Sequence, residues 1–164
     1  MSDSTNLSTL DLEELFEKLD KLLDILNASD ESNILDNLTR FDEVYFELAS
    51  RRLVGKPFDL LAETDKKKET VLERFENEIN RKIVENMSAC EKADIGTEEG
   101  KKRYFELSSQ WSELSKFQSQ LLHYRISSIK NSFEITKELN RELKDSGVLD
   151  ALRRGEFSTE IVDE

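Results

Sequence analysis

The sequence has very few residues that break or cross-link a chain. It contains one proline, five glycines, one cysteine and one histidine among 164 residues. So few turn-forming residues disfavour a protein built from many short strands. The single cysteine, Cys90, cannot form an internal disulfide, and no cysteine or histidine lies at the spacing of a zinc site.

The residues that catalysis or metal binding would need do not occur together. His123 is the only histidine, and no nucleophile motif surrounds it. A di-iron bundle needs Glu-x-x-His on two helices, whereas here Gln120 stands three residues before the single histidine. No glycine-rich phosphate loop is present. We therefore expect a protein that is not an enzyme, with no metal and no cofactor.

Long apolar runs are also missing. No stretch approaches the ~18 apolar residues that a membrane-spanning helix requires. The N-terminal residues MSDSTNLSTL lack the basic and apolar parts of a secretory signal peptide. The sequence therefore predicts no membrane span and a cytoplasmic or nuclear location.

The charge is acidic and unevenly distributed. The net charge is −12, and residues 1–54 hold 5 basic against 13 acidic side chains, while residues 145–164 hold 2 against 6. Both ends would repel a polyanion, which argues against nucleic acid or an anionic membrane as a partner. A basic protein surface fits this charge better, although acidity can also serve only to keep a helical protein in solution.

The most informative feature is a long segment without helix breakers. From Thr97 to Ser146 there is no proline; the one glycine, Gly100, lies in the first turn, and Gly147 follows the end. One helix of this length would extend roughly 70 Å. A compact domain of this size would be about 30–35 Å across. The helix must therefore project from the domain or lie against another chain.

Two amphipathic helices are predicted before it, over residues 10–26 and 31–54. Ser8 or Thr9 is a candidate N-cap for the first, and the pair Gly55 and Pro57 is expected to end the second. The short connection makes them antiparallel neighbours. Their apolar stripes are Leu12, Leu15, Leu19, Leu22 and Leu26 in the first, and Ile34, Leu38, Phe41, Tyr45 and Leu48 in the second.

A third helix is predicted before Gly96, and its start is ambiguous. It could begin near Phe58, or at a capping box that opens at Thr70, because residues 63–68 contain no apolar side chain. Its stripe contains Leu72, Phe75, Ile79, Ile83 and Met87.

These patterns predict an all-α fold: an antiparallel bundle of three to four helices with a long, coiled-coil-like C-terminal helix. The expected regions are a disordered N-terminus (1–9), a three-helix region (10–96), the long helix (97–146), and a short helix with an acidic tail (147–164).

The apolar positions of the long helix change register along its length. Shifts near Gln118 and Thr136 turn successive parts of the stripe in different directions. We expect the segment from Ile126 to Leu143 to have no partner within the chain. The successive stripes are Tyr104, Leu107, Trp111, Leu114, Phe117 and Leu121, then Leu122, Ile126, Ile129 and Phe133, then Ile135, Leu139 and Leu143.

Candidate partner-binding residues follow from this pattern. The aromatic cluster Tyr104, Phe105, Trp111, Phe117 and Tyr124 is either core or a docking patch, since Trp and Tyr are frequent at interfaces. The tail has three apolar residues in an acidic context. The candidates are Trp111, Phe117, Leu122, Ile126, Ile129, Phe133 and Leu139 in the long helix, and Phe157, Ile161 and Val162 in the tail.

The function that fits these features is a non-catalytic scaffold or adaptor subunit of a multi-subunit coiled-coil assembly. Its partners would be other helical subunits or a second copy of itself. Kinetochore, vesicle-tethering and motor-adaptor complexes are built in this way, which is an analogy of architecture alone. Two alternatives remain: a free-standing regulatory bundle that binds a partner helix in a groove, and a helical bundle that opens on a lipid surface.

Overall fold

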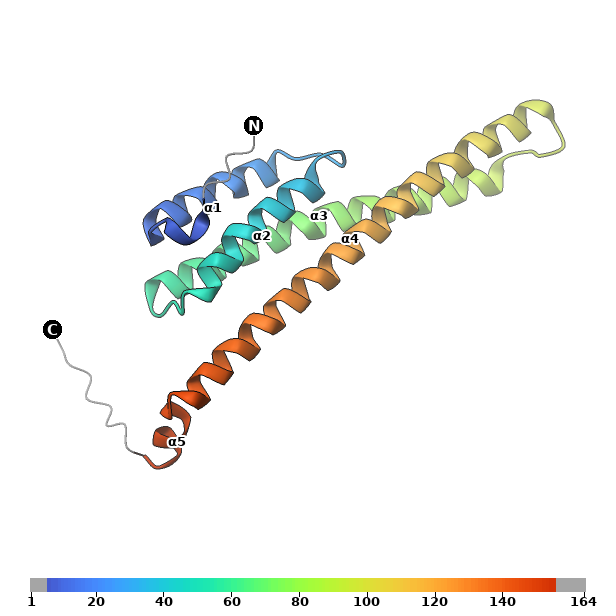
Figure 1. The fold of residues 1–164 in the computed structure, drawn as a ribbon. Coiled ribbons are helices and arrows are strands. Elements are labelled where there is room, and N and C mark those ends of the chain that lie inside the picture. Colours follow the sequence, from blue (N-terminus) through green and yellow to red (C-terminus); the bar gives the residue numbers. More distant parts are fainter. Residues whose placement is uncertain (1–5, 156–164) are drawn as a thin grey trace.

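The structure is a computed structural model, and it describes residues 6–155, apart from the side chains of Leu149 and Leu152. Within these residues the protein is all α-helical, without strands, which confirms the predicted fold class (Figure 1). The elements are the 3-10 helix η1 (Leu7–Thr9) and the α-helices α1 (Leu12–Asn27), α2 (Ile34–Ser50), α3 (Lys56–Lys92), α4 (Glu98–Asp145) and α5 (Val148–Arg153).

The first helix is fixed by a reciprocal cap. Asp11 Oδ1 accepts a hydrogen bond from the Glu14 amide at 2.9 Å, and Glu14 Oε2 accepts one from the Asp11 amide at 2.9 Å. This capping box places the helix start at Leu12, later than the expected residue 10, because the carboxylates satisfy the first free amides.

The N-terminal segment differs from the expected disorder over residues 1–9. Residues 7–9 form η1, and Arg51 at the end of α2 donates hydrogen bonds to the carbonyl oxygens of Leu10 (2.6 Å) and Leu7 (3.0 Å). These bonds tie the segment to the α1–α2 hairpin. Residues 1–5 lie outside the described residues.

Helix α3 is continuous, so the possible second start at Thr70 is not used. Gly55 and Pro57 do not end α2 as expected, because α2 already ends at Ser50. Gly55, with φ of 65°, immediately precedes α3, and Pro57 lies in the first turn of α3, where a missing amide costs nothing. The stretch without apolar residues is helical because Thr64 and Lys68 occupy inward-facing positions and are buried there. The apolar pattern therefore did not predict one continuous helix, because polar residues occupy buried positions of α3.

The core lies where α1, α2, the first part of α3 and the middle of α4 meet. Helices α1 and α2 supply ten of its 17 buried side chains, eight of them from the predicted stripes, while α4 contributes two buried side chains to this cluster. Its buried members are Leu15, Leu19, Leu22, Leu23, Leu26, Ile34, Leu38, Phe41, Val44, Leu48, Leu61, Val71, Leu72, Phe75, Ile79, Phe117 and Leu121.

Helix α4 forms as one unbroken element, as the sequence predicts. The Thr97 hydroxyl caps it by accepting a hydrogen bond from the Gly100 amide at 3.0 Å, and Gly147, with φ of 74°, follows its end. A Cβ at position 100 would lie 1.7 Å from the Asp94 carbonyl oxygen, which explains the single glycine in this helix. Short helix α5 follows.

The shape of the molecule is set by the unequal lengths of its helices. Helices α3 and α4 contain 37 and 48 residues, against 16 and 17 for α1 and α2. The two long helices form an antiparallel hairpin whose tip extends far beyond α1 and α2, and the other end of α4 runs out past the bundle (Figure 1). The molecule therefore has two projecting parts, of which the sequence predicted the C-terminal one. The expectation that residues 126–143 have no partner within the chain is wrong at one point, because Arg52, just after α2, forms an ion pair with Glu142.

Candidate partner-binding surface

The inner side of α4 is held to the bundle by a buried polar cluster. Lys68 of α3 is only 4% exposed, and its Nζ lies 3.7 Å from Asp42 Oδ1 of α2 and 3.4 Å from Asp65 Oδ1. The same Nζ lies 5.7 and 6.0 Å from the ring centroids of Tyr45 and Tyr124, the latter on α4. Charge pairing and cation–π contacts offset the cost of burying this ammonium group.

The cluster is not fully satisfied. Asp42 Oδ1 and the Tyr124 hydroxyl are both buried, and neither has a hydrogen-bond partner of normal geometry. Burial raises the pKa of Asp42, and the Lys68 charge opposes that effect. Burial also raises the pKa of Tyr45 to about 12 and raises that of Tyr124 further. After Leu121, the contact between α4 and the bundle is therefore polar, and two of its buried oxygen atoms lack hydrogen-bond partners.

A second set of polar contacts joins α4 to the edge of α3. Arg125 donates hydrogen bonds to Glu76, including one to Oε2 at 3.0 Å, and to Glu69 Oε2 at 3.0 Å. These two carboxylates raise the pKa of Arg125 and keep it charged. About two turns earlier, Gln118 donates a hydrogen bond to Asn80 Oδ1 of α3 at 2.8 Å. These bonds fix the rotation of α4 about its own axis.

This rotation turns an apolar stripe of α4 away from the bundle. Ile129 and Phe133 are 68% and 65% exposed, and Leu122 and Ile126 are 59% and 47% exposed. Their spacing of four, three and four residues puts all four on one face of a helix. We call Leu122, Ile126, Ile129 and Phe133 the outer stripe. Leu143, one of the exposed large apolar side chains, continues it toward the end of α4 after an interval of polar positions.

The structure separates the sequence-predicted residues into different environments. Four of them form the outer stripe. Phe117 differs from the expectation, since it is buried in the protein's own core and is not available to a partner. Leu139 is half-buried and lies five helical turns from Leu121, on the side of α4 that faces inward. The tail residues Phe157, Ile161 and Val162 lie outside the described residues.

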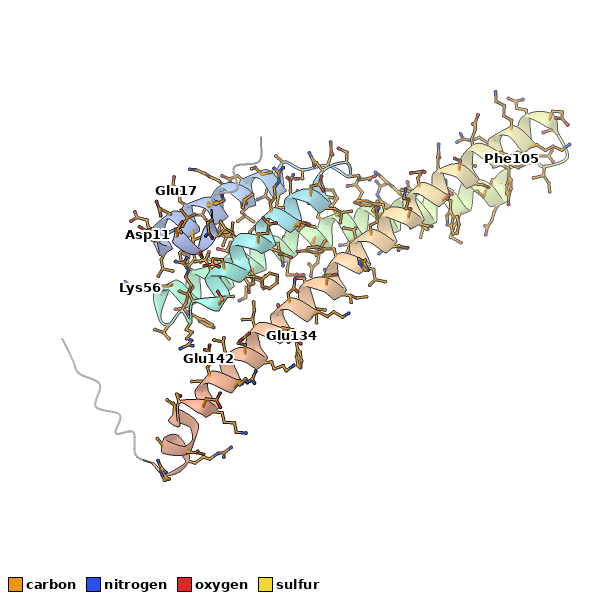
Figure 2. All side chains as sticks on the ribbon, in the orientation of Figure 1. Asp11, Glu17, Lys56, Phe105, Glu134 and Glu142 are labelled. Atoms are coloured by element: carbon orange, nitrogen blue, oxygen red, sulfur yellow. The ribbon has the colours of Figure 1, made fainter. Side chains whose placement is uncertain are left out.

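The predicted aromatic cluster is likewise divided. Phe117 and Tyr124 pack into or against the core, whereas Tyr104, Phe105 and Trp111 are exposed near the tip of the α3–α4 hairpin, where Figure 2 labels Phe105. Trp111 is 45% exposed, so its environment is not that of a core residue.

The hairpin tip carries an apolar groove that the sequence did not reveal. A hollow of about 650 Å³ runs between α3 and α4, with Met87 and Cys90 on one wall and Tyr104 and Trp111 on the other. Below it the buried Asn86 amide donates to the Leu107 carbonyl oxygen at 3.0 Å and joins the two helices. Met87 and Tyr104 belong to the predicted inward stripes, and they are exposed because no third helix reaches this part of the hairpin.

Residues 6–155 contain no group of three or more His, Cys, Asp or Glu side chains placed to hold a metal ion. None of the described helices is both long enough and apolar enough to cross a membrane.

Comparison with known proteins gives no relative from which a function could be transferred: no family model, no curated protein and no solved structure matches this chain.

Proposed function

We propose that this protein is a non-catalytic scaffold or adaptor subunit that binds a helix of another protein along the outer stripe of α4. The observation that carries the proposal is the exposure of four large apolar side chains at coiled-coil spacing on a continuous helix. Contiguous apolar surface on a protein in water is costly unless another surface covers it, and such patches mark interaction sites.

The spacing of the outer stripe specifies the kind of surface that would cover it. Intervals of four and three residues place side chains on a narrow face that receives the knobs of one partner helix. The face has no proline kink and no break, because α4 is continuous and lacks proline from Glu98 to Asp145. A second helix laid along it would complete a two-helix coiled coil outside the bundle, with α1–α3 acting as a rigid support.

The groove at the hairpin tip supports a second candidate function, that of a regulatory bundle that receives a partner helix in a groove. Met87, Tyr104 and Trp111 provide the apolar and aromatic side chains that usually anchor such helices. This groove is confined to a two-helix region remote from the outer stripe (Figure 1). The two candidates therefore make separable predictions: Trp111→Ala affects one and substitutions at Ile129 and Phe133 affect the other.

The test compares tagged wild-type protein with two matched variants, purified from the native cell. The double variant Ile129→Glu/Phe133→Glu introduces two charges into the outer stripe. The control Gln120→Glu/Asn131→Glu introduces the same charge at exposed polar positions of α4 outside the stripe. We expect stoichiometric helical partners with the wild type and the control, and their loss with I129E/F133E.

Two results would contradict the proposal. One is a wild-type protein that is recovered alone as a monomer. The other is an I129E/F133E variant that retains all of its partners, in which case loss of those partners in Trp111→Ala would favour the tip groove.

A further inference from the structure

A row of basic side chains follows the outer stripe along α4. His123, Lys130, Lys137 and Lys144 are spaced by seven residues, and all four are exposed. Leu122, Ile129 and Leu143 lie at multiples of seven residues from one another, and Thr136 occupies the remaining position of this register. Each of the four basic side chains lies one residue after one of these positions. In a coiled coil, side chains at this flanking position pair with charged residues of the facing helix and determine which partner is accepted. We call this set the basic row.

We propose that the outer stripe selects an amphipathic helix of a different protein that carries acidic side chains at heptad spacing, opposite the basic row. This inference rests on the proposed function and adds the chemistry of the partner. Among the described residues, only Lys137 of the three lysines forms an ion pair, with Glu134 at 3.6 Å. Lys130 and Lys144 are therefore ready to pair with an incoming carboxylate.

The opposite flank of the outer stripe offers no competing charge. The corresponding positions there are Arg125, Ser132 and Leu139. Arg125 is already paired with Glu69 and Glu76 of α3, and Leu139 is half-buried. The charge preference of the surface is thus set by the basic row alone.

The same positions disfavour a second copy of this chain as the occupant. In an antiparallel pair the basic row would face its own copy, so that lysine would oppose lysine. In a parallel pair it would face Arg125, Ser132 and Leu139, none of which is acidic. Neither arrangement supplies a carboxylate to Lys130, Lys137 or Lys144, and this disfavours self-association through this surface relative to binding of an acidic helix.

A lipid surface is also a poorer occupant than a helix. The polar side of the same segment carries the exposed carboxylates Glu134 and Glu138, and the whole chain has a net charge of −12. Both features oppose approach to an anionic bilayer. Thr136 and Asn140 continue the register of the outer stripe and would face the partner helix. Asn at such a position fixes the alignment of a helix pair rather than helping the helix to enter lipid.

The experiment uses two designed helical peptides with identical Ile and Leu cores. One carries Glu at all flanking positions and the other carries Lys. Binding to the full-length protein is measured by fluorescence anisotropy at low and high salt. We expect the Glu peptide to bind about tenfold more tightly than the Lys peptide, the effect of three exposed ion pairs, with a smaller difference at high salt.

Two charge-reversed variants make the result specific. In Lys130→Glu/Lys137→Glu/Lys144→Glu the preference should invert in favour of the Lys peptide. The control Lys56→Glu/Lys66→Glu/Lys102→Glu reverses three exposed lysines elsewhere and should keep the wild-type preference. Equal binding of the two peptides, binding of neither, or a preference unchanged by K130E/K137E/K144E would overturn the inference. So would flotation with phosphatidylserine vesicles that this variant abolishes.

The same variants separate this inference from the proposed function. Capture of partners from the native cell is compared for wild type, I129E/F133E and K130E/K137E/K144E. Loss of the same partner in both variants supports the inference. If only I129E/F133E loses the partner, the outer stripe is a docking surface but the acidic-helix inference fails. If neither loses it, the proposed function fails as well.

Discussion

Substitution should destabilise the protein at one apolar position of α4 and be nearly neutral at another that lies only eight residues away. Leu121 is 2% exposed and belongs to the core, whereas Ile129 is 68% exposed. Leu121→Ala removes buried methyl groups and leaves a cavity, which costs about 3 kcal/mol in the free energy of unfolding. For a chain of this size that lowers Tm by about 6–12 °C.

The double variant Ile129→Glu/Phe133→Glu should leave the free energy of unfolding within about 1 kcal/mol of wild type. Both side chains face solvent, so little packing is lost. Glutamate is also at least as good a helix former as isoleucine or phenylalanine. A near-neutral result would mean that the outer stripe does not hold this fold together.

The assay is urea unfolding of the isolated protein followed by far-UV circular dichroism, with Gln120→Glu/Asn131→Glu as the control for added charge. The reasoning is refuted if I129E/F133E destabilises the protein as much as Leu121→Ala, because the outer stripe would then be packed within the molecule. It is also refuted if Leu121→Ala is neutral, because α4 would then not be anchored in the core.

Three further predictions concern the buried polar cluster and the first cap. Lys68→Met should lower the free energy of unfolding by about 3 kcal/mol, since it leaves buried carboxylate charge uncompensated, and adding Asp42→Asn should restore much of the loss in the same urea assay. Burial raises the folded-state pKa of Asp42, so ionisation of this carboxyl group opposes folding. The free energy of unfolding of wild type should therefore rise relative to that of Asp42→Asn as the pH falls through the raised pKa toward 3.8. A difference between the two proteins that does not depend on pH would contradict this. Asp11→Ala removes the reciprocal cap of α1 and should cost about 1 kcal/mol, and an unchanged urea midpoint would show that the cap contributes nothing.

The fold was predictable where apolar spacing and end signals agree. The stripes located α1 and α2, and Thr97 and Gly147 mark the two ends of α4 as predicted, but the expected end of α2 at residue 54 was wrong, since the helix ends at Ser50. The start of α3 was ambiguous because Lys68 lies at a core position, and only the three-dimensional arrangement of Asp42 and the tyrosine rings around it explains why a lysine is tolerated there.

The candidate surface was predictable in part, for a physical reason. Spacing identifies the faces of a helix but does not say which face the rest of the chain covers. The polar contacts of Gln118 and Arg125 settle this by turning Leu122 and Ile129 outward. The exposure of Met87 follows from the unequal lengths of the helices, since α1 and α2 do not reach the hairpin tip.

The most direct test of the account is a zero-length cross-linking experiment on the complex purified from the native cell. A carbodiimide joins lysine amines to carboxylates in contact, and mass spectrometry identifies the linked residues. We predict links from Lys130, Lys137 and Lys144 to acidic side chains spaced at heptad intervals in a helix of another protein. Cross-links that connect these lysines only to residues of this same chain, with the protein recovered as a monomer, would contradict the claim that α4 is a docking surface.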